Sequence, residues 1–138
     1  MKVKEAMHKN ADTCAPSETL AGVANIMKAQ DIGSVPISEN GKLVGMVTDR
    51  DITIRAVADG RNAAQATARD VMSKNVVFCR EDENLEDAVR IMEQKAVRRL
   101  PVLDKNEKLV GMLSLGDVSH ATNQSLSGEL VKSVSAHH

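Results

Sequence analysis

The apolar positions in the first half of the chain change their spacing in a regular order. Between residues 17 and 30 they recur at helical spacing, which predicts an amphipathic helix capped by Ser17. Two short apolar segments follow, and Asn40-Gly41 between them is the strongest signal for a two-residue β-hairpin turn. Helical spacing then returns at Thr48. The predicted elements are a helical lead-in at 2–7, a strand at 12–15, a helix at 17–30, strands at 34–38 and 43–47, and a helix at 48–59 that stops at Gly60.

The same order recurs in the second half of the chain. Met7-His8 has a counterpart in Met72-Ser73, and Cys14 has one in Cys79, at a shift of about 65 residues. A period this long, present twice, indicates a duplicated subdomain rather than a solenoid. The predicted elements are a strand at 76–79, a helix capped by Asp82, strands at 100–103 and 108–113, and a helix that starts at Ser114.

Each repeat therefore has the order β-α-β-β-α, which is too small to bury a full core alone but can do so against a second copy. We expect an α/β (α+β) fold made of two such repeats. The expected boundaries are repeat one at 1–60, a linker of small and polar residues at 61–68, repeat two at 69–122, and a C-terminal tail at 123–138 that has spacing for one or two helical turns.

Composition narrows the classes of function. The chain has 138 residues, of which 42% are hydrophobic and 27% charged, and its formal net charge of −1 disfavours nucleic acid as a partner. One Phe and no Trp or Tyr leave almost nothing on which bases could stack. No apolar run approaches the roughly 18 residues that span a membrane. Without an apolar leader after Met1, a cytoplasmic location is the default expectation. His137 and His138 are either native or the remains of a purification tag.

The segment Gly45–Asp51 carries the most chemistry. It predicts a strand that turns directly into a helix, with Thr48 as N-cap. A helix N-terminus favours anions, and Arg50 adds a fixed positive charge there. Asp51 adds an acceptor for two hydroxyl hydrogen bonds. Donors for phosphate beside an acceptor for sugar hydroxyls suggest a nucleotide, although a threonine cap with charged neighbours is also ordinary helix chemistry. A second copy, Gly111–Asp117, strengthens the nucleotide interpretation.

No catalytic or metal-binding constellation is visible in the sequence. There is no Ser-His-Asp, Cys-His or paired-carboxylate arrangement and no phosphate-binding glycine loop, so an enzyme is not expected. Cys14 and Cys79 could form a disulfide only if their Cα atoms came within about 7 Å, and buried or pocket-lining thiols are the simpler expectation. His8 and His120 are isolated in sequence and are expected at surface or capping positions.

The chain resembles a tandem CBS-domain pair, also called a Bateman module. The resemblance rests on Val35-Pro36-Ile37 with Leu100-Pro101-Val102, and above all on Gly45–Asp51 with Gly111–Asp117. It covers roughly residues 3 to 122, and the chain looks similar to small free-standing bacterial CBS-pair proteins. The resemblance implies two repeats packed about a pseudo-twofold axis, two clefts that take adenosine-containing ligands, and a homodimer.

The resemblance also implies roles for particular residues. Asp51 and Asp117 would hold the ribose hydroxyls, and Thr48 and Ser114 would lie near the phosphates. The adenine would sit between aliphatic side chains and backbone, bordered by Thr13, Cys14, Val35 and Pro36 in one cleft and by Val77, Cys79, Leu100 and Pro101 in the other.

The two copies differ, so unequal sites are expected. Asp49-Arg50 becomes Leu115-Gly116 in the second copy, which leaves Asp117 without an adjacent arginine. Arg98 and Arg99 replace Gly33-Ser34 and are the candidate positive charges there. The alternative is that both arginines are simply solvated.

Two functions follow as hypotheses. The first is a non-catalytic regulatory module that senses AMP, ADP or ATP, with S-adenosylmethionine or NADH as further ligands, and needs no other cofactor. The second is a stress-response or interaction protein with vestigial ligand sites, which would act through an unknown effector protein.

Overall fold

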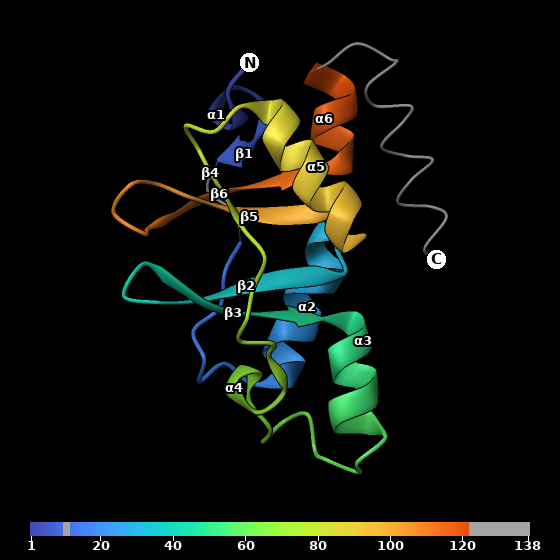
Figure 1. Cartoon of the computed structure of the whole chain (residues 1–138). Coiled ribbons are helices and arrows are strands. Elements are labelled where there is room, and N and C mark those ends of the chain that lie inside the picture. The colour runs from blue at the N-terminus through green and yellow to red at the C-terminus, as the bar shows by residue number, and fades with distance from the viewer. Residues whose placement is uncertain (10–11, 122–138) are drawn as a thin grey trace. The chain divides into compact units, whose positions relative to one another are not determined.

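The computed structural model describes residues 1–9 and 12–121 (Figure 1). Mixed helices and strands confirm the predicted α/β (α+β) class, and the predicted tail at 123–138 lies outside the described residues. The elements are α1 (Val3–Ala6), β1 (His8–Lys9), α2 (Leu20–Gln30), β2 (Ser34–Glu39), β3 (Lys42–Thr48), α3 (Asp49–Ile52), the π-helix η1 (Thr53–Val57), α4 (Ala68–Val71), β4 (Cys79–Arg80), α5 (Leu85–Lys95), β5 (Arg99–Leu103), β6 (Leu109–Ser114) and α6 (Leu115–Ala121).

The chain folds as two compact units that do not follow the order of the sequence repeats. One unit, here the first-repeat unit, is Asp12–Val76. The other, the second-repeat unit, combines Met1–Ala11 with the chain from Val77 onward. The segment that precedes each repeat therefore belongs to the unit built around the other repeat.

A four-stranded sheet in the order β1-β6-β5-β4 organises the second-repeat unit. β5 and β6 form an antiparallel hairpin, β4 runs parallel to β5, and β1 runs antiparallel to β6 (Figure 1). The buried core combines residues from α1, α5, α6 and the sheet, because each of these elements contributes one apolar face. Its members are Val3, Cys79, Leu85, Ala88, Val89, Met92, Leu100, Val102, Leu113 and Val118.

The β2–β3 hairpin organises the first-repeat unit. Asn40 and Gly41 have positive φ angles of 55° and 79°, which confirms the predicted two-residue turn. The predicted strand at 12–15 is reduced to a single parallel bridge between Cys14 and Ile37. Pro36 is tolerated there because its carbonyl accepts from the Cys14 N–H at 3.2 Å, whereas Ser38 supplies the donor that proline lacks.

Both long helices begin later than the sequence predicted. Thr19, not Ser17, is the N-cap of α2, and its hydroxyl accepts from the Gly22 N–H at 3.2 Å. Ser17 lies inside a turn closed by the Glu18 N–H on the Ala15 carbonyl, so it cannot cap the helix. Likewise α5 begins after Asn84 rather than Asp82. Short-range propensity does not show how far such a turn displaces a helix start.

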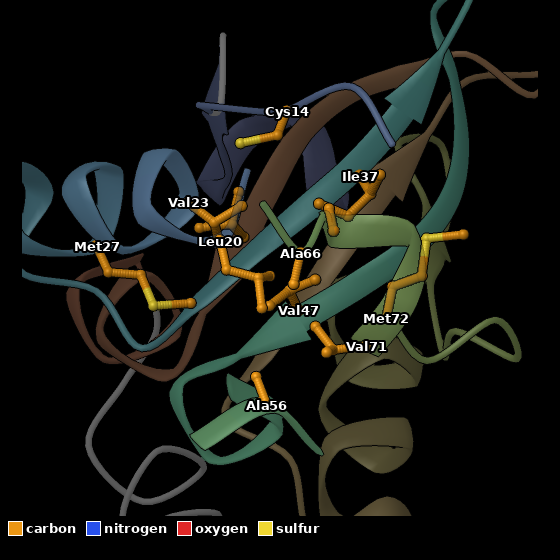
Figure 2. Packing of buried hydrophobic residues seen from close by; sticks show 12 residues of the cluster. Cys14, Leu20, Val23, Met27, Ile37, Val47, Ala56, Ala66, Val71 and Met72 are labelled. Atoms are coloured by element: carbon orange, nitrogen blue, oxygen red, sulfur yellow. The ribbon is translucent and has the colours of Figure 1, made fainter. Parts of the chain in front are cut away.

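The segment at 61–68, predicted as a linker, packs onto the first-repeat unit. Ala66 is buried, and its carbonyl accepts from the Leu20 N–H at 2.9 Å. Figure 2 shows Ala66 beside Leu20 and Val47 in the core of this unit. The core cluster is Cys14, Leu20, Val23, Met27, Val35, Ile37, Val47, Ala56, Ala66, Ala68, Val71 and Met72.

Glycine at one position of the last strand lets the preceding segment approach. A Cβ built on Gly111 would lie 2.4 Å from the His8 carbonyl oxygen, so any side chain there would push β1 away from β6. At the equivalent Gly45 the nearest atom is the flexible Met72 Sδ at 2.6 Å, followed by the Ser73 carbonyl at 3.0 Å.

We therefore expect Gly111→Ala to destabilise the protein more than Gly45→Ala. Overpacking costs about 1–3 kcal/mol, and the backbone atom met at Gly111 moves less easily than a methionine side chain. Urea unfolding of the two variants measures the difference. Equal midpoints would show that β1 does not depend on the close approach.

Candidate functional site

The Asp51 motif, Thr48–Asp51, is a reciprocal capping box at the start of α3. The Thr48 N–H donates to Asp51 Oδ2 at 2.9 Å, and the Asp51 N–H donates to Thr48 Oγ1 at 3.0 Å. The carboxylate is therefore held in one orientation by the backbone. Its Oδ1 has Arg55 Nε at 4.0 Å, beyond hydrogen-bond distance, and the Asp51 side chain keeps 14% of its surface exposed.

The Asp117 motif, Ser114–Asp117, repeats this geometry at the start of α6. The Ser114 N–H donates to Asp117 Oδ2 at 2.8 Å, and the Asp117 N–H donates to Ser114 Oγ at 3.1 Å. The second oxygen differs, because His8 Nε2 lies 2.8 Å from Asp117 Oδ1. The Asp117 side chain is only 9% exposed, so imidazole and backbone together engage both of its oxygens.

The predicted adenine-bordering residues lie on or beside β2 in the first-repeat unit and on or beside β4 and β5 in the second-repeat unit, not on β3 and β6, which lead into the motifs. In the first-repeat unit, Cys14, Val35 and Pro36 are buried around β2, and Thr13 is exposed with its hydroxyl bonded to Ser38. In the second-repeat unit, Cys79, Leu100 and Pro101 are buried around β4 and β5, and Val77 is half-buried. Their role in ligand binding stays a prediction.

The structure brings Arg98 and Arg99 beside the Asp117 motif. Arg99 faces Ser114 across the β5–β6 ladder, and the Leu115 N–H donates to the Arg98 carbonyl at 2.8 Å. Arg98 is exposed and Arg99 half-buried. Arg50 is exposed next to Asp51. All three cations thus flank a motif, although their contact with a ligand stays a prediction.

Sequence reasoning missed two side chains that lie near the carboxylates, Arg55 and His8. Arg55 lies one helical turn after Asp51, a spacing that could have identified it. It is anchored by a hydrogen bond from its Nη1 to the Val71 carbonyl at 3.0 Å. His8 precedes Asp117 by most of the chain, and no sequence signal pairs them, because the pairing depends on β1 joining β6.

Both cysteines are free and buried, as expected from the sequence. Burial raises the pKa of the Cys79 thiol to about 12, with a smaller contribution from Glu83. Burial also raises the pKa of Cys14, followed by the negative charges of Glu18 and Asp12.

Within residues 1–9 and 12–121, His, Cys, Asp and Glu side chains do not gather in groups of three that could hold a metal ion. In the same residues, no helix is both long enough and apolar enough to cross a membrane.

A capping box that directly follows a β-hairpin recurs in both units, so the fold is that of a duplicated α+β domain. The CBS domain family matches residues 3–57 and 68–123, so the chain belongs to the CBS-domain family and carries two copies of the domain.

Known proteins resemble the chain over most of its length. The CBS domain-containing protein YhcV of Bacillus subtilis (strain 168) is 40% identical over 130 residues, which covers 93% of this chain and 91% of that protein. A crystal structure of Hypoxic Response Protein I with two coordinated zinc ions has a TM-score of 0.82 at 29% identity, covering 89% of this chain and all of that one. A crystal structure of CBSX2 in complex with AMP has a TM-score of 0.76 at 28% identity, covering 87% and 94%.

The buried thiols lead to a prediction about reactivity. Because the thiolate is the reactive form, iodoacetamide should label neither cysteine in the native protein at neutral pH and should label both in denaturant. Mass spectrometry of the alkylated chain measures this. Rapid native labelling of Cys79 would contradict the burial.

The raised pKa of Cys79 also sets a pH dependence. A thiol with its pKa raised by folding contributes stability below the unfolded-state pKa, and that contribution is lost as the pH rises from about 9 towards 12. Cys79→Ala should therefore show a weaker fall in unfolding temperature over this range than Cys14→Ala.

Proposed function

We propose that the chain is a non-catalytic regulatory module that binds an adenosine nucleotide through the Asp51 motif. The observation that carries this proposal is the fixed Asp51 carboxylate. Its Oδ2 is held by the Thr48 N–H at 2.9 Å, so Oδ1 is oriented before any ligand arrives. A preoriented carboxylate suits the two adjacent hydroxyls of a ribose, because the cost of ordering it has already been met.

The surroundings of Asp51 favour an adenosine ligand that carries phosphate. Arg50 and Arg55 are both exposed cations within one helical turn of the carboxylate. Val35 and Pro36 offer an aliphatic border for a base, in keeping with the nearly complete absence of aromatic residues. The AMP complex of CBSX2 supports this ligand class. AMP, ADP and ATP are our first candidates, and S-adenosylmethionine and NADH are further ones.

Regulation requires that the nucleotide favour one state of the module over another. A ligand shifts a conformational equilibrium only by its difference in affinity for the two states. The output would pass to an effector protein that the nucleotide-bound state binds better.

Millimolar AMP, ADP, ATP, NADH or S-adenosylmethionine should raise the unfolding temperature if the proposal holds. A ligand at 100 times its Kd stabilises the folded state by about 2.7 kcal/mol, which corresponds to several degrees. Differential scanning fluorimetry measures the shift, and Asp51→Ala should abolish it.

Asp70→Ala is the matched control, because Asp70 forms an equivalent capping box with the Thr67 N–H at 2.9 Å in the same unit. Both variants should lose about 1 kcal/mol of capping energy, whereas only Asp51→Ala should lose the response to ligand. No shift with any ligand would contradict the proposal and favour an interaction protein with vestigial sites.

We also propose that the module forms a homodimer through η1. Ile54 and Val57 lie one turn apart on this helix and are 46% and 66% exposed, although both are large and apolar. Burying such side chains against a second copy would remove them from water.

The double variant Ile54→Asp, Val57→Asp should then run as a monomer in size-exclusion chromatography with light scattering, while the wild type runs as a dimer. A monomeric wild type would contradict the dimer. The exposed pair Asp87→Ala, Arg90→Ala on α5 serves as a surface control.

A further inference from the structure

His8 lies directly against the carboxylate of the Asp117 motif. β1 pairs with β6 so that His8 faces Met112, two residues before Ser114. From there its Nε2 reaches Asp117 Oδ1 at 2.8 Å, while the Ser114 N–H occupies Oδ2 at 2.8 Å. The one carboxylate oxygen that the capping box leaves open is thus already in contact with an imidazole.

The first-repeat unit has the same backbone frame with a different side chain. Ser73 is the repeat counterpart of His8 and faces Met46, two residues before Thr48. Its N–H donates to the Met46 carbonyl at 2.9 Å, and the Met46 N–H donates back at 3.0 Å. A serine side chain is too short to cover the carboxylate as an imidazole does.

We propose that His8 closes the Asp117 motif to a ribose and so makes Asp51 the higher-affinity motif of the module. This inference rests on the proposed function. A ribose diol that approaches Asp117 must first displace the imidazole from Oδ1, because the carboxylate is only 9% exposed and has little other open surface. His8 is therefore the residue that makes the two motifs unequal, in addition to the replacement of Asp49-Arg50 by Leu115-Gly116.

The closure is reversible. The His8 side chain is 75% exposed, so it can swing into solvent without disturbing a packed core. Because the imidazole side of this contact is exposed to solvent, the contact has a modest free energy. We therefore expect removal of the imidazole to tighten nucleotide binding at Asp117 by about three- to tenfold.

Isothermal titration calorimetry with AMP tests the closure in two parent variants, each of which has only one of the two motifs intact. In the Asp51→Ala background, adding His8→Ser should tighten AMP binding by about three- to tenfold. In the Asp117→Ala background, the reciprocal change Ser73→His should weaken AMP binding by a similar factor. The two exchanges place in each unit the residue that the other unit carries.

Each result decides the inference. Unchanged or weaker AMP binding on adding His8→Ser would overturn it, and weaker binding would make His8 a ligand contact instead. If His8→Ser lowers the unfolding temperature by loosening β1, the Ser73→His arm decides alone. If neither the wild type nor any variant binds AMP, the proposed function and this inference are both overturned. If AMP binding depends on Asp51 but is unchanged by His8→Ser and by Ser73→His, only this inference is overturned.

Discussion

The other features of the structure depend on one close contact. The segment that precedes one repeat packs against the last strand of the other repeat, as β1 does against β6. Gly111 has no side chain, so the His8 carbonyl can come to within 2.4 Å of where a Cβ would be. Gly45 admits Met72 and Ser73 in the same way. Because the contact at Gly111 joins segments far apart in sequence, the second-repeat unit combines Met1–Ala11 with the chain from Val77 onward, whereas the first-repeat unit is the continuous stretch Asp12–Val76.

The segments that precede each repeat and pack in the unit of the other repeat, here called the exchanged segments, also supply buried side chains. Val3 of α1 is fully buried in the core of the second-repeat unit, and Val71 of α4 is buried in that of the first-repeat unit. A fully buried valine contributes roughly 1.5–3 kcal/mol, a large share of the stability of a small domain. The short helices thus act as part of the core rather than as linkers, and Ala66 is buried in the same core.

The two motifs show how one backbone arrangement can carry different chemistry. The capping box is the same in both, because a helix that begins directly after a strand needs its first N–H groups satisfied. What differs is the group that reaches the second carboxylate oxygen. Arg55 stands off from Asp51 at 4.0 Å, whereas His8 contacts Asp117 at 2.8 Å. The local sequence thus orients the carboxylate, and an exchanged segment determines whether it is open.

Local patterns in the sequence determined the elements, the Asn40-Gly41 turn and the two capped motifs, because spacing, turn chemistry and capping act within a few residues. The class of fold followed from the repeat. The tertiary structure decided where the two long helices begin, at Leu20 and Leu85. It also decided that Cys14 makes only a single bridge and that residues 61–68 pack onto a core. The contact between His8 and Asp117 was decided in the same way. These features depend on which distant segments share a core, and the spacing of apolar residues within a short stretch does not show which distant segment that stretch packs against.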